Sequence, residues 1–190
     1  MEYKQSMNLV SPSGYAMPFE LSETTPLEIT LGYGKQTHPV TGKEFFHHGV
    51  DFKVYPHTWL KALATGVVSG IASDREKGFN ITVNYRNYAA GSSAVYDVVY
   101  SHIKESICNF GKSVNAGDNI AVCDGTLHIE VRFNGDEIDP IEFLTMVRDN
   151  LIVYEQKTIQ GNNPEIATLD FKVETPYDSQ QPEIDQSGPF

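Results

Sequence analysis

The chain has 190 residues, 40% hydrophobic and 21% charged, which is enough apolar material for one domain with a tail. Its 14 Lys and Arg residues against 25 Asp and Glu residues give a net charge of −11 with His neutral. Such a chain repels phosphate backbones and anionic lipid, which argues against nucleic-acid partners and membrane surfaces. No apolar run approaches the roughly 18 residues of a spanning helix, and no secretory signal is visible at the start.

The middle of the chain has the pattern of a β domain. Residues 1–28 are rich in Ser, Pro and Glu and predict an irregular lead-in, whereas residues 29–146 are short β-like runs separated by Gly, Asn and Asp. The clearest runs, which alternate polar with apolar residues or are rich in β-branched and aromatic ones, are 64–71, 80–86, 94–103 and 126–133. We therefore expect an all-β fold, a compact antiparallel sheet with a sandwich-like core.

One short helix is indicated at the end of this domain. Asp139 can act as N-cap, Pro140 suits the first helical position, and Glu142 stands at the third. Residues 147–190 are expected to hold the end of this helix and an acidic, Pro-containing tail. From residue 155 onward the tail carries seven acids and two lysines. It is either extended or disordered, or it docks a partner, and both alternatives stay open.

The cysteines limit the kinds of site that the chain can build. Cys108 and Cys123 can form one disulfide at most, and two small buried hydrophobic residues are the favoured interpretation. Since no cysteine pair has zinc-finger spacing, any metal site must rest on histidine and carboxylate ligands.

A first group of such ligands stands around residue 50. In a strand, His47 and Asp51 share a face, with Gly49 between them leaving open space. An imidazole and a carboxylate so arranged can hold a divalent metal, and zinc favours nitrogen and oxygen ligands when no thiolate is offered. His48 points to the other face, where a packing or surface role is expected.

The run 126–133 adds a second candidate ligand. One of its faces is apolar, and the other consists of Thr126, His128, Glu130 and Arg132. A histidine between polar neighbours on such a strand is not a core histidine. By pattern alone, His128 is equally well explained as an ordinary histidine on an exposed sheet face.

A third histidine ends the run 94–103. Strand alternation places His102 on the same side as Tyr96, Val98 and Tyr100, at the point where the strand enters a loop. Histidines at loop edges serve acid–base chemistry and are also ordinary surface residues. The pattern does not separate these two roles.

Taken in order, these pieces resemble the lysostaphin-type (LytM-type) zinc metallopeptidases. The resemblance covers about residues 29–146, and the ordered set is far more specific than any single motif. The matching segments are Tyr33–Gly42, His47–Phe52, Ala64–Val68, Tyr100–Ile103, Gly111–Asp118, Leu127–Val131 and Ile138–Pro140.

The resemblance implies a small antiparallel β fold with one Zn²⁺ per chain. Members of the family typically cut short, often glycine-containing cross-bridge or stem peptides of bacterial peptidoglycan. Carried over by position, the metal ligands are His47, Asp51 and His128. A water or the substrate carbonyl takes the fourth position, as an open catalytic zinc requires. His102 is expected to hydrogen-bond the attacking water or the developing oxyanion.

The chain departs from the family pattern in the catalytic pair. The last motif is normally His-x-His, but its first position is Thr126, and the preceding loop is shortened to residues 123–125. A hydroxyl cannot cycle a proton near neutral pH, and losing a general acid–base group costs about 10²–10⁴ in rate. His38 and His57 are candidates to replace the imidazole. Gln36 stands where many members have Arg.

Two functions follow from this mixture. The first is a zinc endopeptidase acting on peptidoglycan peptides, slow or altered in specificity. The second is a catalytically weak, zinc-holding module that binds wall peptides or a protein partner. The substrate would lie in the cell envelope, but the sequence does not locate the protein itself, since no signal peptide or membrane-spanning segment is visible. Delivery by a phage particle, a specialised secretion route or a trimmed leader stays open.

Overall fold

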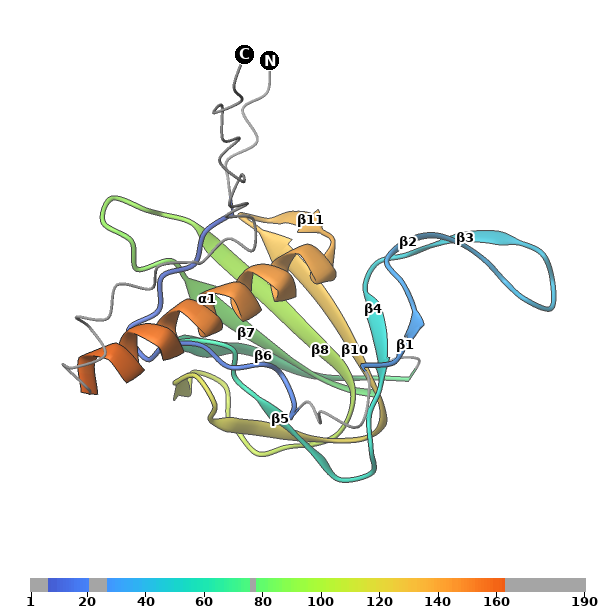
Figure 1. Cartoon of the computed structure of the whole chain (residues 1–190). Coiled ribbons are helices and arrows are strands. Elements are labelled where there is room, and N and C mark those ends of the chain that lie inside the picture. Colours follow the sequence, from blue (N-terminus) through green and yellow to red (C-terminus); the bar gives the residue numbers. More distant parts are fainter. Residues whose placement is uncertain (1–6, 21–26, 76–77, 163–190) are drawn as a thin grey trace, which may run out of the picture. The chain divides into compact units, whose positions relative to one another are not determined.

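The computed structural model describes residues 7–20, 27–75 and 78–162 (Figure 1). The described residues form eleven strands and one helix. The strands are β1 Ile29–Leu31, β2 Gly34–Thr37, β3 Glu44–His47, β4 Val50–Lys53, β5 Thr58–Lys61, β6 Gly66–Asp74, β7 Gly78–Arg86, β8 Val95–Ser106, β9 Ser113–Val114, β10 Asn119–Phe133 and β11 Asp136–Ile138. The helix is α1, Pro140–Asn162.

Nine of these strands form one sheet, and every strand pair is antiparallel, which confirms the predicted fold class. The strand order is β1-β4-β10-β8-β7-β6-β9, with β5 and β11 also paired to β10. The strands β2 and β3 form a separate hairpin that projects from the rest (Figure 1). The long strand β10 is therefore the hub of the sheet.

One face of the central strands makes the core. Alternate residues of β4, β7, β8 and β10 are buried there because each strand has the period-two pattern noted in the sequence. Tyr100 is among them, and its hydroxyl lies 3.0 Å from that of Tyr85. The thiols of Cys108 and Cys123 are both free, so no disulfide joins these two described residues. Burial raises the pKa of the Cys123 thiol to about 12.

The lead-in is part of this core. Residues 7–20 contain no helix or strand, as expected, but Leu9 and Phe19 are buried within the domain. The backbone N–H of Lys61 donates to the carbonyl of Pro18 at 2.8 Å, which fixes the lead-in alongside β5.

The helix begins as the sequence predicts. The Asp139 carboxylate accepts a hydrogen bond at 2.8 Å from the backbone N–H of Ile141, the geometry of an N-cap. The single C-terminal helix is present as predicted. α1 has 23 residues, and it includes positions 155–162, which were assigned to the tail. Good helix formers in this stretch and the absence of proline between Pro140 and Pro164 explain the extension.

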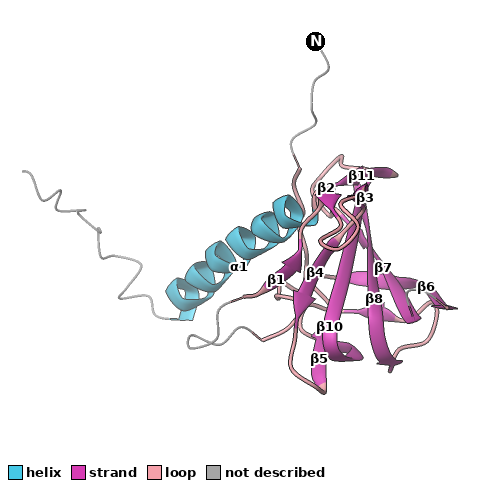
Figure 2. Ribbon diagram, turned by 90° about the vertical axis from the view of Figure 1, so that its right-hand side faces the viewer, coloured by secondary structure: helices cyan, strands magenta, loops and turns pink. Residues whose placement is uncertain are grey.

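The chain divides into two compact units, residues 1–156 and 157–190. Of the second unit the structure describes only the last turns of α1, and the remainder of the predicted tail lies outside the described residues. Within the first unit, α1 lies against one face of the sheet (Figure 2). Among the described residues, no helix has the length and hydropathy needed to cross a bilayer.

Phe143 joins the helix to the sheet, since it is fully buried and its ring lies 4.9 Å from that of Tyr96. We expect Phe143→Ala to lower the free energy of unfolding by about 3–5 kcal/mol, measured by urea denaturation. Val153, 48% exposed on the same helix, is the matched control, and Val153→Ala should change stability by no more than about 0.5 kcal/mol. Equal effects of the two substitutions would contradict this packing.

Candidate metal centre

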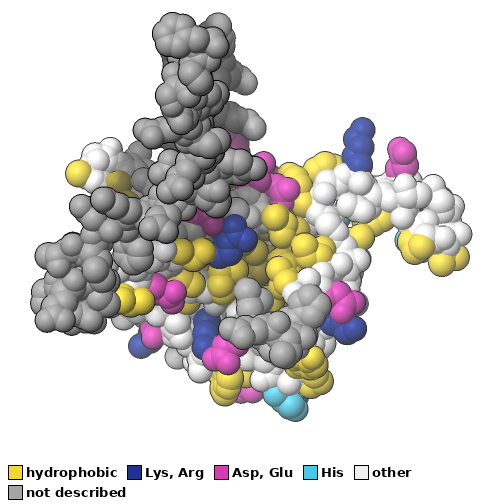
Figure 3. Space-filling view, in the orientation of Figure 1, with side chains coloured by type: hydrophobic (Ala, Val, Ile, Leu, Met, Phe, Trp, Pro, Cys, Tyr) yellow, Lys and Arg dark blue, Asp and Glu magenta, His cyan; other side chains and the backbone are white. Residues whose placement is uncertain are grey.

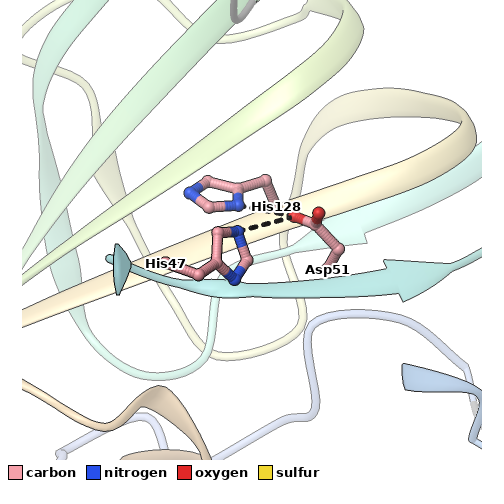
Figure 4. Close-up of side chains that lie close together, drawn as sticks. All are labelled: His47, Asp51 and His128. Atoms are coloured by element: carbon pink, nitrogen blue, oxygen red, sulfur yellow. Dashed lines mark hydrogen bonds and ion pairs between the residues drawn. The ribbon is translucent and has the colours of Figure 1, made fainter. Parts of the chain in front are cut away.

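Strand pairing brings three of the predicted ligands together. In the β4–β10 pair, Asp51 stands directly opposite His128, so their side chains lie on the same face of the sheet. His47 is the last residue of β3 and turns its ring to the same point (Figure 4). Because Leu127 and Ile129 are buried on the opposite face, this site lies on the side of the sheet away from the core.

The distances within this group are short. The Asp51 Oδ1 atom lies 2.6 Å from His128 Nδ1 and 3.6 Å from His47 Nε2. One ligand atom from each of the three side chains lies within 4.8 Å of the other two. His128 is almost completely buried, whereas His47 and Asp51 are partly open to solvent.

Gly49 makes room for His128. The sequence suggested open space at this residue, which was wrong. A Cβ atom built on Gly49 would lie 2.5 Å from His128 Cε1 and 2.5 Å from the Ile129 carbonyl oxygen. The space is filled by the ring and backbone of β10, so glycine is required for the close approach of the two strands.

The charged forms of His128 and Asp51 stabilise each other, and Glu130 also favours the charged form of His128. Burial works against the charged form of His128, but hydrogen bonds and charges from Asp51 and Glu130 outweigh it and raise the pKa of His128 to about 9. Burial likewise opposes ionisation of Asp51, yet the hydrogen bond and charge of His128 hold the Asp51 pKa below its ordinary value. A divalent cation binding here would take the place of the proton between them.

His102 reaches the same site through a β-bulge. Between the pairs Ile81↔Tyr100 and Phe79↔Ile103, two residues of β8 stand opposite one residue of β7. His102 has a left-handed φ of 59° there, and its ring centroid is 5.9 Å from that of His128. The prediction that His102 shares a face with Tyr100 was therefore wrong. Tyr100 lies in the core, whereas the bulge turns His102 toward the cluster of His47, Asp51 and His128.

Thr126 lies where alternation predicts. It stands opposite Lys53 in the regular β4–β10 register, two residues from His128 and therefore on the same face. Its side chain is exposed, unlike that of His128.

The other histidines have local roles. His48 is exposed and its Nδ1 lies 2.8 Å from Glu137 Oε2, a surface pairing. His38 accepts hydrogen bonds at its Nδ1 from backbone N–H groups in the β2–β3 turn. His57 occupies the turn between β4 and β5 with a φ of 61°. The candidate replacements His38 and His57 are not among the three clustered ligands.

Three hydrogen-bond contacts around the cluster were not predicted from the sequence. The Gly32 carbonyl accepts hydrogen bonds from His47 Nδ1 at 2.8 Å and from the Gln36 amide at 3.1 Å, so Gln36 supports the loop that holds His47. Glu130 lies 3.1 Å from His128 Nε2. Of these, only Glu130 was detectable, because its two-residue spacing places it on the face of His128.

The residues present suit a zinc ion. The donor set is two imidazole nitrogens and one carboxylate oxygen, and donors bound to one zinc at about 2.0–2.2 Å lie within about 4.4 Å of each other. Small side-chain movements satisfy that limit from the observed positions. The Ser101 hydroxyl, directly opposite His128 in the β8–β10 pair, is buried and has no hydrogen-bond partner among the described residues, as expected where an ion or water completes a site.

Residues 45–140 match the model of peptidase family M23, and the chain belongs to this family. The matched segment contains His47, Asp51, His102, Thr126 and His128. The chain is also 32% identical over 117 residues to a Haemophilus influenzae protein described as an uncharacterized metalloprotease. That match covers 55% of this chain but only 22% of the relative.

Solved structures show the same fold. A zinc-containing peptidase from Vibrio cholerae superimposes with a TM-score of 0.52 and 23% identity, covering 67% of this chain and 39% of that one. The catalytic domain of lysostaphin, an antimicrobial peptidase from Staphylococcus simulans, gives a TM-score of 0.50 and 22% identity, over 63% and 92% of the two chains. The fold is therefore that of a lysostaphin-type, LytM-like peptidase domain.

The close approach at Gly49 can be tested directly. Gly49→Ala should lower the free energy of unfolding by about 1–3 kcal/mol, because the added methyl group meets a backbone carbonyl that cannot move aside. The control is Gly32→Ala, where the nearest atom to a new Cβ is 3.7 Å away, in ordinary contact. Urea denaturation of both variants measures this, and a Gly49→Ala protein as stable as wild type would refute the packing described here.

Proposed function

We propose that this protein is a zinc metallo-endopeptidase that cleaves cross-link or stem peptides of peptidoglycan, with activity reduced by Thr126. The observation that carries the proposal is the cluster of His47, Asp51 and His128 in a chain of peptidase family M23. The peptidoglycan target rests on the ordered motifs that this chain has in common with lysostaphin-type peptidases.

The three clustered side chains would hold the zinc ion and leave its remaining position open. Zinc bound there supplies a Lewis acid for the scissile carbonyl and lowers the pKa of a bound water toward about 7. Asp51 contributes a negative charge, and the two histidines contribute neutral nitrogens, so a net positive charge remains to attract the carbonyl oxygen.

His102 would act on the reacting atoms. Its ring stands edge-on to that of His128 at the rim of the cluster, and it is exposed. From there the imidazole can hydrogen-bond the attacking water and transfer its proton, or donate to the carbonyl oxygen as charge develops on it. The bulge in β8 places His102 on this side of the sheet.

Thr126 would limit the rate. Its hydroxyl faces the same side as His128 and can orient the substrate or water by a hydrogen bond. It cannot accept and return a proton near neutral pH, so one of the two expected proton-transfer groups is absent at this position. A loss of about 10²–10⁴ in rate follows.

The substrate would meet a surface beside the site that is partly apolar. Hydrophobic side chains gather at the outer end of the β2–β3 hairpin (Figure 3), and Val40, Phe45 and Phe46 are exposed. Phe46 packs against His48 at a ring distance of 4.9 Å, directly beside His47. A peptide lying along this hairpin would reach the zinc position.

Thr126 also favours a second candidate function. A site that holds zinc but lacks one proton-transfer group suits a module that binds wall peptides or a protein partner without cleaving them. In that case zinc and the exposed hydroxyl would recognise a carbonyl group, and His102 would contribute only a hydrogen bond.

Digestion of purified muropeptides distinguishes the two. Wild type should release product slowly, and Thr126→His should be about 10²–10⁴ faster because the second imidazole is restored. His102→Asn should abolish product while retaining zinc, since asparagine tolerates the left-handed φ but transfers no proton.

The matched control is His57→Asn, which removes a surface imidazole at another left-handed position and should leave the rate unchanged. Product from Thr126→His but none from wild type would overturn the enzyme proposal and favour the binding module. Unchanged turnover by His102→Asn would remove this residue from the mechanism.

A further inference from the structure

Each histidine of the cluster uses one ring nitrogen toward the site and the other away from it. His47 donates its Nδ1–H to the Gly32 carbonyl at 2.8 Å, which leaves Nε2 as the nitrogen facing Asp51. His128 has the opposite arrangement: Nδ1 faces Asp51 at 2.6 Å, and Nε2 contacts Glu130 Oε1 at 3.1 Å. The two rings are thus held from behind by different groups, a backbone carbonyl and a carboxylate.

Burial of the Glu130 carboxylate costs free energy, so the protein is expected to retain it for a functional reason. Glu130 is buried, with a side chain only 12% exposed, and burying a carboxylate destabilises a protein unless the charge is paired. It stands two residues after His128 on β10, so both side chains lie on one face of the strand. The strand itself therefore fixes the carboxylate behind the ring.

We propose that Glu130 is a positioning residue for the metal centre. Its carboxylate accepts the Nε2–H of His128, which selects the tautomer with a lone pair on Nδ1 and points that lone pair at Asp51 and His47. The negative charge also makes Nδ1 a stronger donor to a cation. This inference rests on the proposed zinc site, and it names what makes His128 a ligand.

The geometry argues against Glu130 as a fourth ligand. The lone pairs of the two ring nitrogens diverge, so a carboxylate on Nε2 does not reach an ion bound at Nδ1. The described group whose ligand atoms all lie within 4.8 Å of one another consists of His47, Asp51 and His128 and does not include Glu130. Glu130 is therefore expected to act through His128 and to touch neither metal nor substrate.

Zinc affinity of the full chain, measured by competition with a chromophoric chelator, tests this role without any hydrolysis assay. Glu130→Ala should weaken zinc binding by about 10–100-fold, because the ring loses its orienting partner. Glu130→Gln should weaken it less, because the amide oxygen still accepts the Nε2–H. Glu137→Gln is the matched control, because the Glu137 carboxylate contacts the Nδ1 atom of His48 at 2.8 Å but lies outside the cluster. The Glu137→Gln protein should bind zinc with wild-type affinity.

A cobalt-substituted sample gives a second readout. The visible absorption of bound Co²⁺ depends on its ligands, so the spectrum of Glu130→Gln should keep the shape seen for wild type while requiring more metal to saturate. A changed spectrum would make Glu130 a ligand and overturn the positioning role. Wild-type zinc affinity in Glu130→Ala would overturn it as well.

Two controls distinguish a change in zinc affinity from a loss of folding and from a failure of the proposed peptidase function. Thermal unfolding of the metal-free proteins identifies any variant that is simply unfolded, and Glu130→Gln, which is nearly isosteric, keeps the test decisive if Glu130→Ala fails to fold. Wild type that binds zinc but leaves muropeptides intact would refute the proposed peptidase function alone. Glu130→Ala with unchanged affinity in a protein that hydrolyses muropeptides would refute this inference alone.

Discussion

The register between β4 and β10 is the constraint on which the site depends. The same pairing that sets Asp51 opposite His128 sets Phe52 opposite Leu127, and the latter two are buried in the core. A slip by one residue would expose that apolar pair and turn His128 into the core. Burial of the core therefore determines the spacing of the ligands, and Gly49 allows the strands to approach closely enough for a short carboxylate–imidazole contact.

The clustered side chains and the candidate proton-transfer residues lie on different parts of the fold. His47, Asp51 and His128 lie on paired strands, and the Gly32 carbonyl and Glu130 contact the two imidazole rings from behind. His102 reaches the site only because a bulge interrupts β8, and Thr126 lies exposed on β10. Thr126 is exposed, and it is not part of the His47, Asp51 and His128 cluster.

The sequence predicted the strands and the grouping of His47, Asp51 and His128 better than it predicted side-chain direction. Period-two patterns located β7, β8 and β10, because burial on one face is a local property. The side of His102 was predicted wrongly, since a bulge depends on pairing with a neighbouring strand. The filled space at Gly49 and the Gly32 carbonyl behind His47 also depend on contacts between segments distant in sequence. α1 continues through positions 155–162, which were assigned to the tail because the segment from residue 155 onward is acidic and contains proline.

X-ray absorption at the zinc edge, recorded on the zinc-loaded wild-type protein, tests the central claim most directly. The account predicts a four-coordinate shell of nitrogen and oxygen at about 2.0–2.1 Å, with outer scattering from two imidazole rings. A shell made only of oxygen, without imidazole scattering, would show that His47 and His128 do not hold the ion and would contradict the account.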